Sequence, residues 1–442
     1  MKKFLLIPLA IVLVGALIFG GCKAAPPAPE EIRIGSVVSL TGMYAGFGEG
    51  GAFGVEAAVE DINKLGGVYV EEFGRKLPVK LIVADCESDP LKAGTLAEDL
   101  VLRDKVHFLV PPMEPPPMRA PIATIADRHK IPHVTAHGPL EPWLGMRMAV
   151  DPPWQYTWTT CFSIVTPAPP GDFRDKPGYT IIDTWMAMLD MFGGQTNKVA
   201  GVFASDDPDG IGWYGLFPKA LEEAGYDVIG EERKLGLAPF GTTDFTSVIK
   251  EWKDNDVEIL WGNCPGPHWG TMWRQAQALD FQPKMVSAAR AALFYPDVVA
   301  WGGDLPHGVG IEIWWDPSYK DCPGIGGTTP QSLAERWAEA TGQPLNPNIG
   351  WSYQLVQILV DAIERAGTLD ADTVVKAIGE TDMMTICHRV LFDKETHLSQ
   401  IPLSYGQWFK TDKPEVWELK IVFSKHDFID VAAEPMFPVP YP

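Results

Sequence analysis

Basic residues are scarce in this chain of 442 residues, which has 36 lysines and arginines against 57 aspartates and glutamates. Its formal net charge at neutral pH is −21. Because binding to nucleic-acid phosphates needs a basic surface, a chain this acidic is not expected to bind nucleic acid. A second long apolar run is also missing after the N-terminal one, so no further membrane-spanning segment is expected.

The sequence also lacks the patterns of catalysis and of metal binding. Its six cysteines form no CxxC pair, and no two histidines have metal-ligand spacing on one predicted helix. No GxSxG motif occurs, and no serine or cysteine stands beside a recognisable base. We therefore expect no metal, no cofactor and no enzymatic activity.

The N-terminal segment has the pattern of an export signal. Lys2 and Lys3 precede an apolar run that ends in small residues and Cys22. This order is typical of a bacterial lipoprotein, in which residues 1–21 are removed and Cys22 carries the lipid. A plain transmembrane anchor is the alternative, because the run is nearly long enough to span a membrane. Both interpretations predict an extracytoplasmic protein that is tied to a membrane, with the proline-rich residues 22–31 as a tether.

Strand-like and helix-like segments alternate in two stretches, separated by a proline- and aromatic-rich break at residues 139–178. Before the break the predicted strands are 32–40, 77–84, 107–110 and 132–135, with helices at 51–65, 91–102 and 118–129 between them. Such alternation predicts parallel sheets with helices on both faces. A chain of this length is expected to form two domains, with a ligand-binding cleft between them.

Residues 46–51 fit the GxGxxG pattern of dinucleotide-binding sites. Three observations count against that function: the loop begins several residues after its strand, no acidic residue follows at the required distance, and an exported protein has little access to nicotinamide cofactors. What remains is a predicted helix start whose free backbone N–H groups attract an anionic or polar group of a ligand.

Several segments closely resemble bacterial branched-chain amino acid-binding proteins. The likeness is carried by residues 34–42 (IGSVVSLTG), Gly48 and residues 54–68, with shorter motifs at 83–90, 205–210 and 389–393. These proteins are type I periplasmic binding proteins of ABC importers for hydrophobic amino acids and amides. The resemblance implies an α/β fold of two Rossmann-like three-layer lobes joined by a three-strand hinge. It implies a first lobe of residues 31–152 plus 288–400 and a second lobe of 153–287 plus 401–442.

The resemblance also implies partners. A small-molecule ligand would close the hinge, a membrane permease would select the closed form, and a cytoplasmic ATPase would drive transport. The alternative is a sensory binding protein that presents its closed form to a receptor or kinase. In either case the solute is an amino acid-like compound, an amide, or an aromatic or carboxylic acid.

The family's clamp for an α-amino acid is altered in this chain. The loop that supplies hydroxyl groups corresponds to residues 113–118, which contain Met113 and Glu114 but no serine or threonine. The next segment leaves Thr135 and His137 as polar candidates. The acidic residue that holds the ammonium group falls at Ala289 or Arg290. Arg290 would suit a carboxylate or another electron-rich group of the ligand, or it forms an ion pair within the protein.

The ligand's polarity stays open, because Glu114 and Asp209 could hold a cation and Asp209 could equally cap a helix. Sixteen tryptophans favour an apolar or aromatic ligand, although most are expected in the core. Cys86 matches a family cysteine whose disulfide partner is missing from the loop at 113–118. The expected ligand-binding residues are Phe47, Met113, Glu114, Thr135, His137, Asp209, Trp213, His268 and Arg290.

Overall fold

The computed structural model describes residues 28–413 and 416–441, and residues 31–442 form one compact unit. The predicted signal segment 1–21, the lipidation site Cys22 and most of the tether lie outside the described residues. Among the described helices, none is long and apolar enough to cross a membrane.

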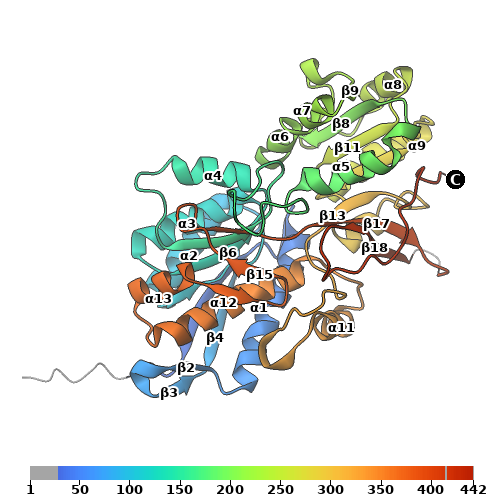
Figure 1. Cartoon of the computed structure of the whole chain (residues 1–442). Coiled ribbons are helices and arrows are strands. Elements are labelled where there is room, and N and C mark those ends of the chain that lie inside the picture. The colour runs from blue at the N-terminus through green and yellow to red at the C-terminus, as the bar shows by residue number, and fades with distance from the viewer. Residues whose placement is uncertain (1–27, 414–415, 442) are drawn as a thin grey trace, which may run out of the picture. The chain divides into compact units, whose positions relative to one another are not determined.

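The first of the two large sheets has six parallel strands in the order β16-β7-β6-β5-β1-β4. Figure 1 labels β4 and β6 of this sheet. These strands are β1 (Ile32–Val38), β4 (Val79–Asp85), β5 (Phe108–Leu109), β6 (His133–His137), β7 (Thr157–Cys161) and β16 (Leu398–Gln400). The helices associated with it are α1 (Ala45–Lys64), α2 (Pro90–Leu102), α3 (Pro116–His129), α4 (Leu140–Met148), α12 (Asn348–Ala366) and α13 (Ala371–Gly379). Helices cover both faces, so the central strands are almost wholly buried.

The second sheet runs in the order β10-β8-β11-β12-β13-β17-β18, with β9 paired to β8. Its strands are β8 (Val199–Ser205), β9 (Asp227–Val228), β10 (Leu237–Ala238), β11 (Ile259–Asn263), β12 (Met285–Ala289), β13 (Gly310–Ile313), β17 (Ser404–Lys410) and β18 (Trp417–Ser424). Strand β17 pairs antiparallel with both β13 and β18, and all other pairs of this sheet are parallel. Its helices are α5 (Ile181–Phe192), α6 (Pro208–Tyr214), α7 (Phe217–Glu223), α8 (Thr246–Asp254), α9 (Gly266–Ala278) and α10 (Tyr295–Val299).

Smaller elements complete the fold. Helix α11 (Pro330–Thr341) packs on α12. Two separate hairpins are formed by β2 (Val68–Val70) with β3 (Arg75–Leu77) and by β14 (Asp382–Met384) with β15 (Arg389–Leu391).

The chain passes between the two sheets three times: after β7, after β13, and between β16 and β17. Three crossings agree with the expected three-strand hinge. The first two come later in the chain than the expected boundaries at 152 and 287, because β7 pairs in the first sheet and β13 pairs in the second. The lobe limits themselves stay a prediction.

The glycine-rich segment at 46–51 is not a loop, and here the sequence-based prediction was wrong. Helix α1 begins at Ala45, so these glycines lie in its first turns and do not precede it. They permit close packing. A Cβ on Gly48 would lie 2.0 Å from the carbonyl oxygen of Ser39, and one on Gly51 would lie 3.0 Å from Asn348 Nδ2 of α12. Gly54, about one turn beyond the motif, is packed more tightly still, since a Cβ there would lie 2.2 Å from the carbonyl oxygen of Ile349 on α12. The motif therefore brings α1 against α12 and the end of β1.

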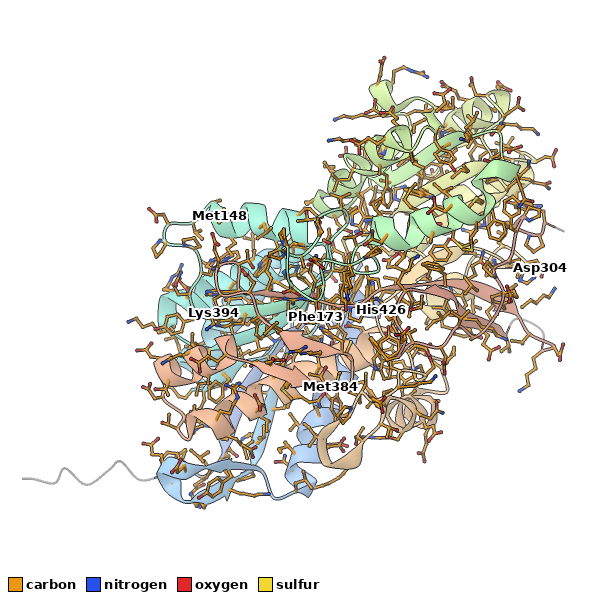
Figure 2. The ribbon with its side chains drawn as sticks, viewed as in Figure 1. Met148, Phe173, Asp304, Met384, Lys394 and His426 are labelled. Carbon is orange, nitrogen blue, oxygen red and sulfur yellow. The ribbon has the colours of Figure 1, made fainter. Side chains whose placement is uncertain are left out.

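The segment at 139–178, expected to lack helical periodicity, contains α4 and β7. Helix α4 was missed because it buries only Leu140, Trp143 and Arg147, while Met148 at its end is exposed (Figure 2). All sixteen tryptophans are buried, and the twelve largest fully buried side chains are all tryptophan. Tryptophan is therefore mainly a core residue in this protein.

Replacing Gly54 by alanine should destabilise the protein by about 1–3 kcal/mol, because the added methyl group collides with the backbone of α12. Gly145 on α4 is the matched control, since a Cβ there meets nothing within 4 Å. Gly145→Ala should be neutral or stabilise by about 0.5–1 kcal/mol. Urea denaturation of both variants measures the difference, and equal effects would contradict the packing role of Gly54.

Candidate functional site

Three neighbouring parallel strands of the second sheet end side by side and place polar residues together. Strand β8 ends at Ser205, β11 at Asn263, and β12 is followed by Arg290. Ligands of open α/β sheets bind at this edge, where the carboxyl ends of the strands meet. Helix α6 begins there too, with Asp207 as its N-cap and Asp209 in its first turn.

Arg290 is buried and is held by two carboxylates of its own lobe. Its Nη2 lies 2.9 Å from Asp207 Oδ2 and donates to Ser205 Oγ at 2.5 Å, while its Nη1 lies 3.3 Å from Asp209 Oδ2. Burial would lower the pKa of Arg290, but both aspartates outweigh it and raise that pKa. The ion-pair alternative for Arg290 is therefore the arrangement seen. Both terminal nitrogens of the guanidinium are engaged within the lobe, and only its buried Nε has no hydrogen-bond partner among the described residues.

The two aspartates differ in their environment. Burial alone would raise the pKa of Asp207, but Arg290 and several hydrogen bonds lower it below its ordinary value. Asp209 is more deeply buried, and burial raises its pKa to about 6 although Arg290 opposes this. Asp209 also accepts hydrogen bonds from Trp213 Nε1 at 3.2 Å and from Asn263 Nδ2 at 3.3 Å. The helix cap considered for Asp209 was the wrong assignment, since Asp207 caps α6.

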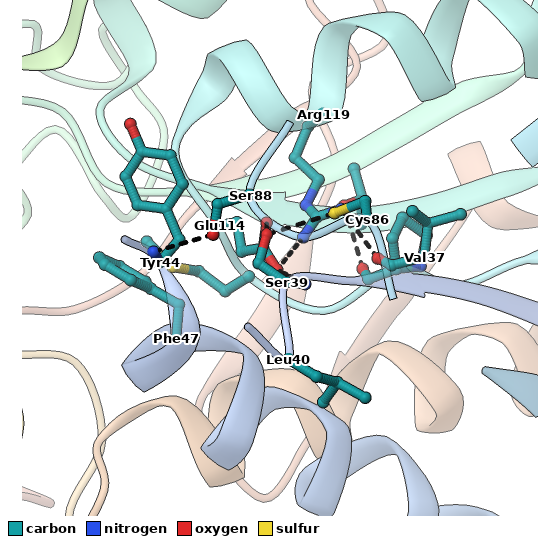
Figure 3. A network of polar contacts seen from close by, with 12 residues as sticks. Val37, Ser39, Leu40, Tyr44, Phe47, Cys86, Ser88, Glu114 and Arg119 are labelled. Atoms are coloured by element: carbon teal, nitrogen blue, oxygen red, sulfur yellow. Dashed lines mark hydrogen bonds and ion pairs between the residues drawn. The ribbon is translucent and has the colours of Figure 1, made fainter. Parts of the chain in front are cut away.

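Glu114 is engaged inside the first lobe (Figure 3). Its Oε1 accepts the backbone N–H of Ser39 at 2.8 Å and pairs with Arg119 Nη2 at 2.8 Å, and its Oε2 accepts Ser39 Oγ at 2.8 Å. Burial raises the pKa of Glu114, and Arg119 opposes the shift. The carboxylate is committed to β1 and α3, so the structure does not bring Glu114 to a ligand.

Thr135 and His137 lie on β6 and are fully buried. Thr135 Oγ1 donates to the carbonyl oxygen of Pro111 at 3.1 Å. The ring of His137 stacks on Trp143 with centroids 4.4 Å apart, and burial lowers its pKa to about 3. Both side chains serve the interior of the first lobe.

An inner cavity lies between the lobes, with a volume of about 20 Å³, which is room for about one water molecule. It brings together five of the nine predicted residues. Its lining consists of Phe47, Met113, Pro115, Gly138, Phe162, Asp209, Trp213, Asn263, Arg290, Leu293, Glu312 and Trp314. The first-lobe wall is apolar, and no serine or threonine is among these described lining residues.

Glu312 is the most informative residue that sequence reasoning missed. It lies on β13, is 1% exposed, and its Oε2 has no hydrogen-bond partner among the described residues. Burial raises the pKa of its carboxyl to about 8, which the nearby indole N–H groups of Trp314 and Trp185 only partly oppose. The available signal was an isolated acid within the apolar stretch of residues 309–315.

His268 lines a separate outer cavity of about 430 Å³. The lining of this cavity includes Met43 and Gly46 from the first lobe, and Phe240, His268 and Asp297 from the second. His268 therefore lies apart from the five predicted residues of the inner cavity.

No group of three or more potential metal ligands occurs in residues 28–413 or 416–441. The five cysteines of that part are free and buried, and Cys86 Sγ lies 3.3 Å from Ser39 Oγ.

Comparison with known proteins decides the family. Residues 31–413 match the profile described as periplasmic binding protein. The chain belongs to this family. The fold prediction is thereby confirmed, and the family implies an extracytoplasmic place of action and a small-molecule ligand. Members of the family bind substrates and are not enzymes.

Two relatives show the extent of the likeness. A Leu/Ile/Val-binding protein homologue from Brucella melitensis is 33% identical over 361 residues, covering 80% of this chain and 84% of the relative. A Pseudomonas aeruginosa protein that binds leucine, isoleucine, valine, threonine and alanine is 21% identical over 407 residues, covering 90% and 95%. The relatives indicate an ABC-type solute-binding protein.

Solved structures share the fold. The leucine-binding protein LivK from Thermotoga maritima has a TM-score of 0.66 at 18% identity, covering 89% of this chain and 99% of its own. A solute-binding protein from R. palustris in complex with 4-hydroxybenzoate has a TM-score of 0.67 at 17% identity, covering 90% and 98%.

Replacing Arg290 by methionine should destabilise the protein by about 3–5 kcal/mol at neutral pH, because Asp207 and Asp209 are left as unpaired buried charges. The loss should shrink on acidification, when the carboxylates take up protons, and should be partly recovered by adding Asp207→Asn and Asp209→Asn. Arg103→Met is the control, since its pair with Asp99 is exposed and is worth at most about 1 kcal/mol. Thermal and urea denaturation measure these changes. A stable Arg290→Met variant would contradict the internal pairing.

Proposed function

We propose that this protein is an extracytoplasmic solute-binding lipoprotein that captures a small organic solute between its lobes and delivers it to an ABC importer. The observation that carries the proposal is the inner cavity, whose wall comes from both lobes. Phe47 and Met113 lie on the first lobe, and Asp209 and Arg290 follow strands of the second. A solute seated there contacts both halves of the molecule and links them.

The size of the inner cavity supports a hinged mechanism. About 20 Å³ is far too little for an organic solute, so the lobes must separate to admit one. The three crossing segments are where such a movement takes place. A permease that recognises only the closed form then takes up solute from loaded protein. The lipid on Cys22 would keep the binding protein near that permease.

The lining of the cavity favours a solute with an apolar or aromatic body. Phe47, Phe162, Trp213 and Trp314 contribute rings, and the first lobe presents no hydroxyl group among the described lining residues. Related proteins were solved in complex with isoleucine and with 4-hydroxybenzoate. Because the hydroxyl clamp for an α-carboxylate is missing here, leucine, isoleucine and valine are not the preferred solutes.

Solution X-ray scattering on the purified protein, with and without solutes identified by mass spectrometry of co-purified material, tests this function. A cognate solute should reduce the radius of gyration and, at about 100 times its dissociation constant, should stabilise the protein by about 2.7 kcal/mol. Phe47→Ala should abolish both effects. Phe53→Ala is the matched control on the same helix, because Phe53 packs on Trp337.

Two results would contradict the proposal: an unchanged radius of gyration with every solute tried, or chemical conversion of a solute by the protein. If leucine, isoleucine or valine stabilised the protein more than any other solute, only the conclusion drawn from the altered clamp would be wrong.

A further inference from the structure

Glu312 lines the inner cavity, and its Oε2 has no hydrogen-bond partner among the described residues, although the indole N–H groups of Trp314 and Trp185 near the carboxyl group lower its pKa. It stands between Ile311 and Ile313 on β13, and its side chain is 1% exposed. Nearly all buried polar atoms of folded proteins have hydrogen-bond partners, so an orphaned carboxylate oxygen calls for an explanation. Because Glu312 lines the inner cavity, a group of a solute seated there would lie within its reach.

The charges around Glu312 decide the sign of that group. Of the twelve described residues that line the cavity, Arg290 alone is basic, and Asp207 and Asp209 already pair with it. These three charges sum to −1, and an ionised Glu312 adds another negative charge. On the adjacent strand β17, Tyr405 is paired in register with Glu312, and its side chain carries no positive charge. An anionic solute would meet net repulsion, whereas a cation would reduce the negative charge of the site.

The aromatic residues of the cavity also favour a positively charged group on the solute. The ring of Phe162 stacks on Trp314 with centroids 5.6 Å apart, and lies 6.2 Å from the ring of Trp213. Phe47 stacks on Trp314 from the first lobe at 6.0 Å. Faces of aromatic rings carry negative potential and attract ammonium groups, most strongly when the site is shielded from water.

We propose that the inner cavity binds an organic cation, a protonated or quaternary amine with an apolar or aromatic body, and that Glu312 Oε2 is its counter-ion. This inference rests on the proposed function. Glu312 holds a proton at neutral pH in the free protein, because burial raises its pKa to about 8. Binding then replaces that O–H proton by the cationic nitrogen, and the proton passes to solvent.

Four probes with a phenyl ring separate the charge classes: benzylamine as a protonated amine, benzyltrimethylammonium as a quaternary amine, benzyl alcohol as a neutral compound and benzoate as an anion. Titration calorimetry in two buffers of different ionisation enthalpy measures affinity and proton release together. The two amines should bind, with release of up to one proton, at least tenfold more tightly than the alcohol, and benzoate should bind most weakly.

Glu312→Gln keeps the shape of the side chain and removes its charge, and it should weaken amine binding at least tenfold. The same change should stabilise the free protein above about pH 8. The raised pKa of Glu312 means that the folded wild type loses stability as pH rises from about 4.5 to about 8, and the variant escapes that loss. Glu222→Gln on the exposed face of α7 is the matched control and should change neither quantity.

A merely structural Glu312 would give the opposite pattern, with lower stability of the variant and unchanged amine affinity. That pattern would overturn the inference. Tighter binding of benzoate or benzyl alcohol than of the amines would overturn it too, as would the absence of binding by either amine. If benzoate reduced the radius of gyration in solution scattering, the solute would not be a cation, but the proposed solute-binding function would still stand. If no solute reduced the radius of gyration, both the cation proposal and the proposed function would be wrong.

Discussion

A charge buried away from water needs a partner, and at the centre of this protein that requirement is met within one lobe. Arg290 lies between Asp207 and Asp209, and the three side chains bind the carboxyl ends of β8 and β12 to the start of α6. The pairing fixes the geometry of the second-lobe wall before any solute arrives. Because it consumes the one basic side chain of the described cavity lining, it also leaves Glu312 as a carboxyl group without a counter-ion.

The first lobe contributes in a different way. Glu114 could have been a second acidic group for the solute, but Arg119 and the end of β1 hold it inside the lobe. The adjacent loop then presents Met113 and Pro115 to the cavity, and α1 presents Phe47. The polar side chains of the cavity lining thus come from the second lobe, whereas the first lobe contributes apolar side chains. An apolar wall facing a polar wall suits a two-lobed binding protein, because exclusion of water by the apolar wall strengthens an ionic interaction made at the polar one.

The sequence predicted parallel sheets with helices on both faces, because alternating strands and helices leave a strong periodic signal. The motifs at 34–42 and 54–68 predicted the family. The charge relations of the site could not be predicted. Arg290 and Asp209 are far apart in the chain, and only the shared edge of the sheet shows that they neutralise each other. The glycines at 46–51 have the spacing of a phosphate loop, yet their purpose is contact with α12 and β1, which depends on tertiary packing. Glu312 carried a weak signal, because one acid within an apolar strand is visible but its unpaired state is not.

The protonation of Glu312 in the free and bound protein tests the account most directly. Infrared difference spectroscopy at neutral pH, comparing free protein with protein saturated by a bound amine, reports on buried carboxyl groups. On binding, a protonated carboxyl band should disappear and a carboxylate band should appear, and both changes should be missing in Glu312→Gln. A spectrum in which the protonated carboxyl band persists in the bound wild type would contradict it.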